Sequence, residues 1–162
     1  MSAKKSKDTV KVGAPTAMNK KAYHNFELVE KVEAGLELTG SEVKSLRAGH
    51  ADLSGSYARL DDNGEVWLVG ASIAQYEQAG EYNHEPLRKR KLLLHKQQIK
   101  RIQVKLEQRG FTLVPLKIYF NSRGLAKIEL GLAKGKRQFD KRKTIADRQQ
   151  KRDLDRDMKK YR

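Results

Sequence analysis

The sequence predicts a mainly β protein, in which a small antiparallel barrel, closed or partly closed, carries flanking helices and two disordered basic tails. Three observations indicate this fold class. Apolar residues recur at every second position in several segments, and turn residues separate these segments. Two stretches with the period of an α-helix interrupt the strands. Cationic residues concentrate at both ends of the chain and leave the middle nearly neutral.

Charge divides the chain of 162 residues into three parts. The last 29 residues contain 13 Lys or Arg and five Asp, a net charge of +8, with few sizeable apolar side chains. Residues 1–21 contain six Lys and one Asp, which leaves +2 for residues 22–133. We therefore expect a flexible basic arm over residues 1–18, one compact domain over 19–133, and a basic tail over 134–162 that is disordered alone.

Composition excludes several classes of protein. The chain has no Cys, so it can form neither disulfides nor a thiolate metal site. No apolar run approaches the roughly 18–20 residues that span a bilayer, and the N-terminus lacks the apolar region of a secretory signal. We expect a cytoplasmic protein that needs no cofactor and no membrane.

The first strand is predicted over residues 24–38, where apolar and polar residues alternate. A bend or bulge is expected at Gly35. Thr39 and Glu42 then have the spacing of a capping box, in which the first residue caps a helix and the acidic residue reaches back to it. Gly49 is a stop signal, so this helix has about two turns.

Two hairpins are predicted. Residues 56–60 and 65–69 flank an Asn-Gly turn, the strongest short-range hairpin signal. Residues 112–120 and 126–132 also alternate and are joined by a polar loop that ends in Gly. Pro115 cannot donate a ladder hydrogen bond, so its strand must be an edge strand or bulged there.

Residues 71–85 are polar and irregular, and they lead into a second predicted helix. This helix runs from about Lys96 to Arg109, with His95 at the cap position and Gln98 three residues later. The strands and the two helices together give the small barrel.

The acidic residues Asp61, Asp62 and Glu65 raise the possibility of metal-dependent nuclease chemistry, since carboxylates bind Mg²⁺. They also lie at the tip of a predicted hairpin, where Asp is simply a turn former. The turn interpretation is favoured. The four histidines lack metal-ligand spacing and phosphate-binding glycine loops are absent, so we expect no enzyme.

Four consecutive cations, from Arg88 to Lys91, precede an apolar triplet. Strand geometry would send these side chains to both faces of a sheet. Projecting Arg and Lys on the edge of a small barrel are suited to contact phosphates. They are equally suited to a solvated edge strand, where Lys discourages aggregation. The residues alone leave both interpretations open.

The basic tail has two features beyond its charge. Gly135 is a hinge between the last strand and a basic cluster, in which Asp140 can order a neighbouring Arg. Leu154, Met158 and Tyr161 are spaced to form one narrow apolar stripe on an otherwise charged helix. We expect this helix to form against a partner and not alone.

These residues identify a family. Over residues 19–162 the chain closely resembles the SsrA-binding proteins, or small protein B, of bacterial trans-translation. The matching motifs are Asn19-Lys20-Lys21-Ala22 with His24, Glu33-Ala34-Gly35-Leu36, the run from Leu38 to Gly49, Arg90-Lys91-Leu92-Leu93-Leu94, Gly135-Lys136-Arg137 and Asp140-Lys141-Arg142.

The resemblance implies a barrel of the oligonucleotide-binding type in a non-enzymatic adaptor. Such an adaptor binds the tRNA-like domain of transfer-messenger RNA and, as a monomer in a complex with elongation factor Tu, delivers it to stalled 70S ribosomes. The basic tail then enters the empty messenger channel beside the small-subunit decoding region and folds into a helix. The alternative is a ribosomal or initiation-factor-like barrel protein that binds ribosomal RNA, since it would share the basic tails.

The resemblance places RNA contact around Glu33, Leu93 and Lys127. With the matching motifs and the basic run, the predicted RNA-binding residues are Asn19, Lys20, Lys21, His24, Glu33, Arg88, Arg90, Lys91, Leu93, His95 and Lys127. The predicted ribosome-binding residues of the tail are Gly135, Lys136, Arg137, Asp140, Lys141, Arg142 and Met158. Two positions depart from the common pattern: position 95 is His or Asn in the family, and Asp157 precedes Met158 where family tails can carry an apolar pair.

Overall fold

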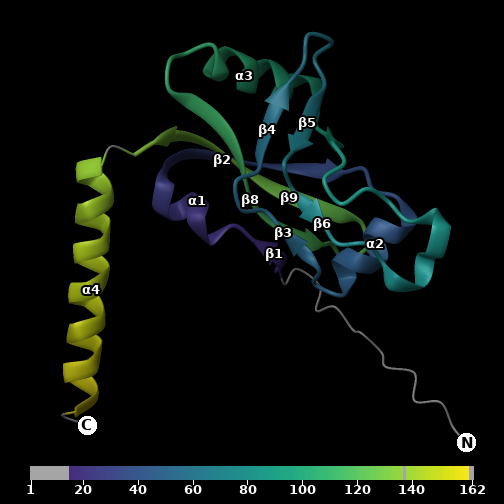
Figure 1. Ribbon diagram of the computed structural model, residues 1–162. Coiled ribbons are helices and arrows are strands. Elements are labelled where there is room, and N and C mark those ends of the chain that lie inside the picture. Colours follow the sequence, from purple (N-terminus) through teal and green to yellow (C-terminus); the bar gives the residue numbers. More distant parts are fainter. Residues whose placement is uncertain (1–14, 137, 161–162) are drawn as a thin grey trace, which may run out of the picture.

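A computed structural model describes residues 15–136 and 138–160, without the side chains of residues 138–141, 144, 157 and 159–160. The predicted arm before residue 15 and Arg137 lie outside the described residues. In chain order (Figure 1) the elements are β1 Pro15–Met18, α1 Lys20–Asn25, β2 Phe26–Leu36, α2 Gly40–Arg47, β3 Ala51–Asp52, β4 Tyr57–Leu60, β5 Val66–Val69, β6 Ser72–Ile73, the 3-10 helix η1 Glu77–Tyr82, β7 Arg90–Leu93, α3 Lys96–Leu106, β8 Phe111–Phe120, β9 Ala126–Gly135 and α4 Gln138–Lys160.

Six strands close into an antiparallel barrel. Their order is β8-β4-β5-β7-β2-β9, and β9 pairs again with β8 to complete the circle. β1 adds to β8 from outside, and β3 and β6 form a separate two-stranded sheet. The predicted mainly β fold, with a small antiparallel barrel and flanking helices, is confirmed. The ordered domain begins earlier than predicted, because β1 already belongs to the sheet.

The strand pairings around the barrel are unequal in length. β9 pairs with β2 and with β8 along nearly its whole length. In contrast, the pairing of β4 with β8 consists of Ala58 opposite Leu113 alone. The pairing of β2 with β7 consists of Gly35 opposite Leu93 and Leu36 opposite Leu92. The barrel therefore consists of a long unit (β2, β9 and β8) and a short unit (β4, β5 and β7), which join at two narrow seams.

β8 buries both of its faces, which the sequence did not indicate. The predicted single apolar face of this strand is wrong, because a bulge between Pro115 and Lys117 changes the alternation. Leu113 and Ile118 lie in the barrel core, whereas Val114 packs against α1 on the outside. The bulge itself confirms the expectation at Pro115. Since α1 covers the outer face of β8, this strand has no solvated side there.

β2 forms as predicted, but its apolar residues do not share one face: Phe26 and Leu28 pack with α1 on the outside, whereas Val32, Ala34 and Leu36 face the barrel core. The predicted bulge at Gly35 is not where the irregularity occurs. The irregularity lies between Leu28 and Glu30. At Gly35, a Cβ atom would lie 3.2 Å from the Cβ of Leu93, which is closer than atoms normally pack. Glycine there allows β7 to approach β2. The predicted strand also began too early, since His24 belongs to α1.

The two predicted hairpin loops have the same construction. The Asp61 backbone N–H donates to the Glu65 carbonyl, and the Asp61 Oδ1 atom accepts the Glu65 backbone N–H at 2.8 Å. Asn121 makes the corresponding two bonds with Leu125. In each loop the last residue is a glycine with φ near +75°, a conformation that favours glycine. Each loop is thus held by the Asp or Asn side chain at its first position.

The two predicted helices of the domain begin where the sequence indicates. The Thr39 N–H donates to the Glu42 Oε2 atom at 2.8 Å at the start of α2, and the His95 N–H donates to the Gln98 Oε1 atom at the start of α3. α3 ends at Leu106, earlier than predicted, and buries Ile102 in the barrel core. The polar segment before β7 contains β6 and η1 in place of a fully irregular loop.

The tail forms α4, which stands beside α1 and apart from the barrel (Figure 1). Its described apolar side chains, Ile145, Leu154 and Met158, are all exposed. Contacts inside the helix support it, such as the hydrogen bonds of Gln149 and the ion pair of Arg156 with Asp153. Leu154 and Met158 are four residues apart and share one face of α4, whereas Tyr161, the third residue of the predicted stripe, lies outside the described residues. The sequence predicted a tail that is disordered alone, but the structure has a helix here without a partner.

Candidate nucleic-acid interface

Glu33, Leu93, His95 and Lys127 line one pocket of about 490 Å³. The strand pairing explains why residues so distant in sequence meet. Gly35 of β2 lies opposite Leu93 of β7 on one side and opposite Lys127 of β9 on the other. Glu33 precedes Gly35 by two residues and therefore projects from the same face of β2. The long β2 strand thus carries the pocket.

The carboxylate of Glu33 is held from two sides. The Lys127 Nζ atom lies 3.6 Å from its Oε1 atom, and the hydroxyl of Tyr119 donates to its Oε2 atom. Burial, together with the hydrogen bond to Glu33, raises the pKa of Tyr119 to about 12. Tyr119 is therefore a protonated donor at neutral pH. The Glu33 side chain is 55% exposed, so its remaining lone pairs face solvent.

A second carboxylate beside the pocket is neutralised by two lysines. The Glu129 carboxylate lies 3.2 Å from the Lys31 Nζ atom and 3.1 Å from the Lys117 Nζ atom. Burial alone would raise the pKa of Glu129, but the ion pairs with Lys117 and Lys31 lower it. Three lysines and two carboxylates therefore follow the outer face of β2, β9 and β8, with a net positive charge. The sequence analysis missed Tyr119, Lys117 and Lys31.

The other wall of the pocket is apolar. Leu93 is 52% exposed and Leu125 is 55% exposed, although both are aliphatic. A pocket with an aliphatic wall, an oriented carboxylate acceptor and a lysine donor can contact the flat face of a base or ribose and hydrogen-bond its polar edge.

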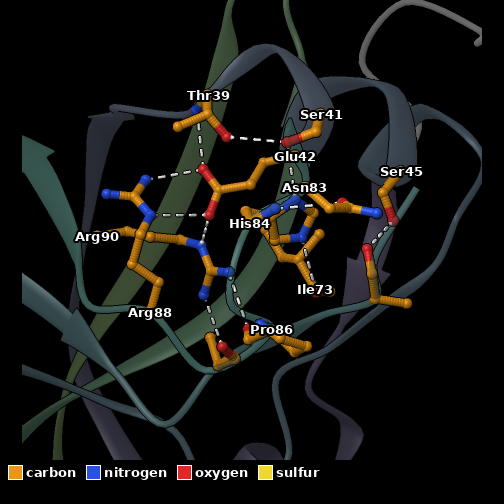
Figure 2. Close-up of polar contacts among 12 residues, drawn as sticks. Thr39, Ser41, Glu42, Ser45, Ile73, Asn83, His84, Pro86, Arg88 and Arg90 are labelled. Carbon is orange, nitrogen blue, oxygen red and sulfur yellow. Dashed lines mark hydrogen bonds and ion pairs between the residues drawn. The ribbon is translucent and has the colours of Figure 1, made fainter. Parts of the chain in front are cut away.

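Arg88 and Arg90 lie elsewhere and serve the fold (Figure 2). Both guanidinium groups bind the carboxylate of Glu42, whose side chain and that of Arg90 are 0% exposed. Arg90 also donates to the carbonyls of Ala71 and Pro86. The prediction that Arg90 contacts RNA is wrong, because a buried guanidinium whose three nitrogens all donate within the fold cannot reach a phosphate. Arg88 remains partly exposed but is bound at 2.8 Å.

The predicted edge position of the basic run is also wrong. β7 pairs with β5 on one side and with β2 on the other, so it is an inner strand. Alternation sends Arg90 into the barrel and Lys91 outward, where its amine forms an ion pair with Glu65. Lys91 thus stays on the surface, two residues before Leu93, but it does not line the Glu33 pocket.

The predicted contacts at the start of the domain separate into buried and exposed residues. The Asn19 side chain is buried, donates to the carbonyls of Leu53 and Pro115, and accepts the Ala22 N–H at the start of α1. Its predicted contact with RNA is therefore wrong. Lys20 and Lys21 are exposed and His24 is half-buried, so these three can meet a ligand.

Part of the predicted tail motif still belongs to the barrel. Gly135 is the last residue of β9, and the Lys136 N–H donates to the Asn25 carbonyl at 2.9 Å. Arg137 and the side chains of Asp140 and Lys141 lie outside the described residues. Arg142 and Met158 are exposed on α4.

The acidic hairpin tip is occupied by its own turn. The Asp61 carboxylate accepts two backbone N–H groups and the indole N–H of Trp67. Within residues 15–136 and 138–160, no group of three His, Cys, Asp or Glu side chains is placed to hold a metal ion. In the same part of the chain, no helix has the length and apolar character to cross a membrane. The turn interpretation of Asp61 is the one that the contacts bear out.

Three comparisons place these features among known proteins. A family model described as SmpB protein matches residues 16–160. An SsrA-binding protein of Symbiobacterium thermophilum is 53% identical over 140 residues, which cover 86% of this chain and 88% of that protein. One of Chloroflexus aurantiacus is 52% identical over 147 residues, 90% of this chain and 91% of that protein. A solved structure described as "tmRNA-SmpB: a journey to the center of the bacterial ribosome" matches with 52% identity and a TM-score of 0.65, over 82% of this chain and 95% of that chain.

Proposed function

Because this chain belongs to the SmpB protein family, we propose that it binds transfer-messenger RNA and acts in trans-translation on ribosomes. The observation that carries the proposal at the level of residues is the convergence of Glu33, Leu93 and Lys127 on one pocket. Its aliphatic wall and held carboxylate suit an unstacked nucleotide, and the lysines around it suit the neighbouring phosphates.

The finer assignment is that this pocket holds the tRNA-like domain of the RNA. Glu33 accepts a hydrogen bond from a base or ribose, Lys127 contacts a phosphate, and Leu93 and His95 support the nucleotide from the β7 side. On α1, the side chains of Lys20, Lys21 and His24 add contacts to a neighbouring part of the RNA. The lysine at 127 therefore serves both to hold Glu33 and to attract RNA.

Binding to the isolated tRNA-like domain tests this assignment. Glu33→Gln should weaken binding, measured by electrophoretic mobility shift, more than Glu27→Gln does, because Glu27 is an exposed carboxylate on the opposite face of the same strand. Lys127→Ala should weaken binding and reduce the salt dependence by roughly one unit. Equal effects of the two glutamate substitutions would remove Glu33 from the site.

The tail supplies the second half of the proposed function. Gly135, Lys136, Arg137, Asp140, Lys141 and Arg142 begin a segment that enters the vacant messenger channel near the small-subunit decoding region. The exposed stripe of α4 that includes Met158 packs against that channel. The protein acts as a monomeric cytoplasmic adaptor without catalysis of its own, and elongation factor Tu takes part in delivery.

A tail variant tests this division. Replacing Asp140, Lys141 and Arg142 together with Ala should abolish tagging of nascent chains on stalled ribosomes, while affinity for the tRNA-like domain stays nearly unchanged. A ribosomal protein with a structural role is the competing function. It would remain on every ribosome through a high-salt wash, whereas the adaptor would be substoichiometric and would dissociate.

A further inference from the structure

The short unit of the barrel carries a second surface in which aromatic rings alternate with cations. Along β4, β5 and β7 every second side chain points toward the core and is buried, or half-buried at Leu60. The side chains between them point outward. Apart from Leu93, which lines the Glu33 pocket, they form what we term the Trp67 face: Tyr57, Arg59, Trp67, Val69, Lys91 and, directly before β7, Lys89.

The strand register places a cation on each side of the only tryptophan in the chain. Trp67 of β5 lies opposite Arg59 of β4 and opposite Lys91 of β7. In the adjacent row Tyr57, which is 44% exposed, lies opposite Val69. A pocket of about 240 Å³ opens on this face, and its lining residues are Arg59, Asp61, Trp67, Val69 and Lys89.

The indole of Trp67 is fixed in advance. Its Nε1 atom donates to the Asp61 Oδ2 atom at 3.1 Å, and Asp61 is itself held by the backbone of the hairpin loop. Burial opposes but does not outweigh the hydrogen bond from the Glu65 backbone, which lowers the pKa of Asp61. A ring that is already held by its edge loses little conformational entropy when another ring stacks on it.

Two of the three cations on this face, Arg59 and Lys89, are not neutralised by the fold. Within residues 15–136, Lys91 is paired with Glu65, but neither Arg59 nor Lys89 has a carboxylate partner, and both are exposed. Their donors are available to an anion. This contrasts with Arg88 and Arg90 in the same part of the sequence, which are bound to Glu42.

We propose that the Trp67 face binds a single-stranded segment of RNA, with an unpaired base stacked on Trp67 and the flanking phosphates on Arg59 and Lys89. Aromatic rings bind bases through stacking whatever the sequence, and cations beside them follow the backbone. A duplex would not fit this surface, since its bases are already stacked on one another. The charge argues for RNA over an apolar protein partner.

The Trp67 face and the Glu33 pocket adjoin at β7, where Lys91 of the face and Leu93 of the pocket are two residues apart and both point outward. The pocket beside Trp67 and the pocket beside Glu33 share no lining residue, and Glu33 and Lys127 lie on the long unit. The proposal therefore goes beyond the binding of one RNA domain: the same barrel can hold two RNA segments at once. The second segment comes either from another part of the same RNA or from a different RNA.

Because the chain has a single tryptophan, its fluorescence reports binding at the Trp67 face directly. Adding a ten-nucleotide oligouridylate to the full-length protein should quench Trp67 fluorescence in a saturable way, because a stacked base quenches the indole. Arg59→Ala and Lys89→Ala should each lower the salt dependence of this binding by roughly one unit. Arg123→Ala, an exposed cation on the other hairpin loop, and Glu33→Gln should leave the quenching curve unchanged.

Trp67→Leu removes the reporter, so its effect is measured by the fluorescence anisotropy of a labelled oligonucleotide. Loss of stacking should weaken binding roughly five- to a hundredfold, while Trp67→Phe keeps most of the affinity. Thermal melting of each variant separates loss of binding from loss of fold. Absence of quenching in the wild-type protein, or unchanged salt dependence in both Arg59→Ala and Lys89→Ala, would overturn the proposal.

A final arm identifies where the segment comes from. If the protein saturated with full-length transfer-messenger RNA is already quenched, and the tRNA-like domain alone does not quench it, the segment belongs to the remainder of that RNA. If the saturated complex is still quenched by the oligouridylate, the face is open to a different RNA. Both results require a working Trp67 face, and neither depends on the Glu33 pocket.

Discussion

Charged side chains in this protein have two distinct roles, and their burial tells them apart. Glu42 and Arg90 are fully buried and bind each other, so they act on the stability of the fold. Glu33 is exposed and lies beside Lys127, so its carboxylate is available to a ligand. A buried ion pair costs much to break, because removing one partner leaves the other charge in an apolar environment.

Glu42→Gln should therefore destabilise the protein. The substitution leaves the guanidinium of Arg90 buried without a counter-charge, and we expect a loss of roughly 3–5 kcal/mol in the free energy of unfolding. Chemical denaturation of the variant measures this loss. Glu27→Gln, at an exposed position of β2, is the control and should change stability by less than about 0.5 kcal/mol. A similar value for both variants would mean that the cluster contributes no stability.

The same cluster predicts how stability falls in acid. Burial would raise the pKa of Glu42, but hydrogen bonds from Arg88 and the Thr39 N–H and the charge of Arg90 lower it from 4.5 to about 2. A lowered pKa means that the contribution is complete above pH 4.5 and is lost as the pH falls toward 2. The difference amounts to on the order of 3 kcal/mol. Denaturation at a series of pH values should show this loss in the wild type and not in Glu42→Gln.

Tyr119 should contribute to RNA binding through Glu33. Its hydroxyl donates to the carboxylate, so Tyr119→Phe frees Glu33 to rotate without removing the ring. We expect a three- to tenfold loss of affinity for the tRNA-like domain, about the value of one hydrogen bond. In the double variant with Glu33→Gln, the two losses should not add, because both remove the same arrangement. Fully additive losses would show that the tyrosine acts independently.

At the scale of elements, alternation and turn residues predicted most of the barrel. The two hairpins, the helix caps and the bulge at Pro115 follow from local chemistry and were predicted correctly. α1 and β1 were missed, because their short segments owe their structure to packing on β8. The double-sided burial of β8 was missed for the same reason, since α1 covers its outer face.

The sites show the same limit. A run of cations in a sequence does not reveal which of them meets a buried carboxylate, and Glu42 was recognised only as a capping residue. The contact forms only because α2 lies against the segment that leads into β7. Arg88 and Glu42 are 46 residues apart in the sequence. Likewise, Tyr119 lies 86 residues from Glu33, so no local pattern could join them.

α4 is the element that the fold needs least. It buries none of its described apolar side chains, whereas residues up to Lys136 still bond to the barrel. Ending the chain after Lys136 should therefore lower the melting temperature by less than about 2 °C. Ending it after Ala133 also removes the pairing of Gly135 with Phe26 and should lower it further. Calorimetry compares the two, and equal melting temperatures would show that residues 134–136 add nothing to the barrel.

At the scale of the whole molecule, the barrel separates three surfaces that can act independently. The Glu33 pocket lies across the seam between β7 and the long unit, the Trp67 face lies on the short unit, and α4 extends beyond both (Figure 1). An adaptor that must meet several partners at once needs such a division. A small closed barrel provides such a division, because the outward-pointing side chains of all its strands rest on the same core.

The two narrow seams determine where this barrel opens first. So few backbone pairs join the short unit to the long unit that β4, β5 and β7 should detach together in a partial unfolding event, at lower free energy than β2, β8 and β9. Amide hydrogen exchange should find the first three strands the less protected. The Glu33 pocket spans one of these seams, since Leu93 belongs to β7 and Lys127 to β9. Bound RNA would then hold the two units together, and the free energy of opening of β7 should rise by RT ln(1 + [RNA]/Kd).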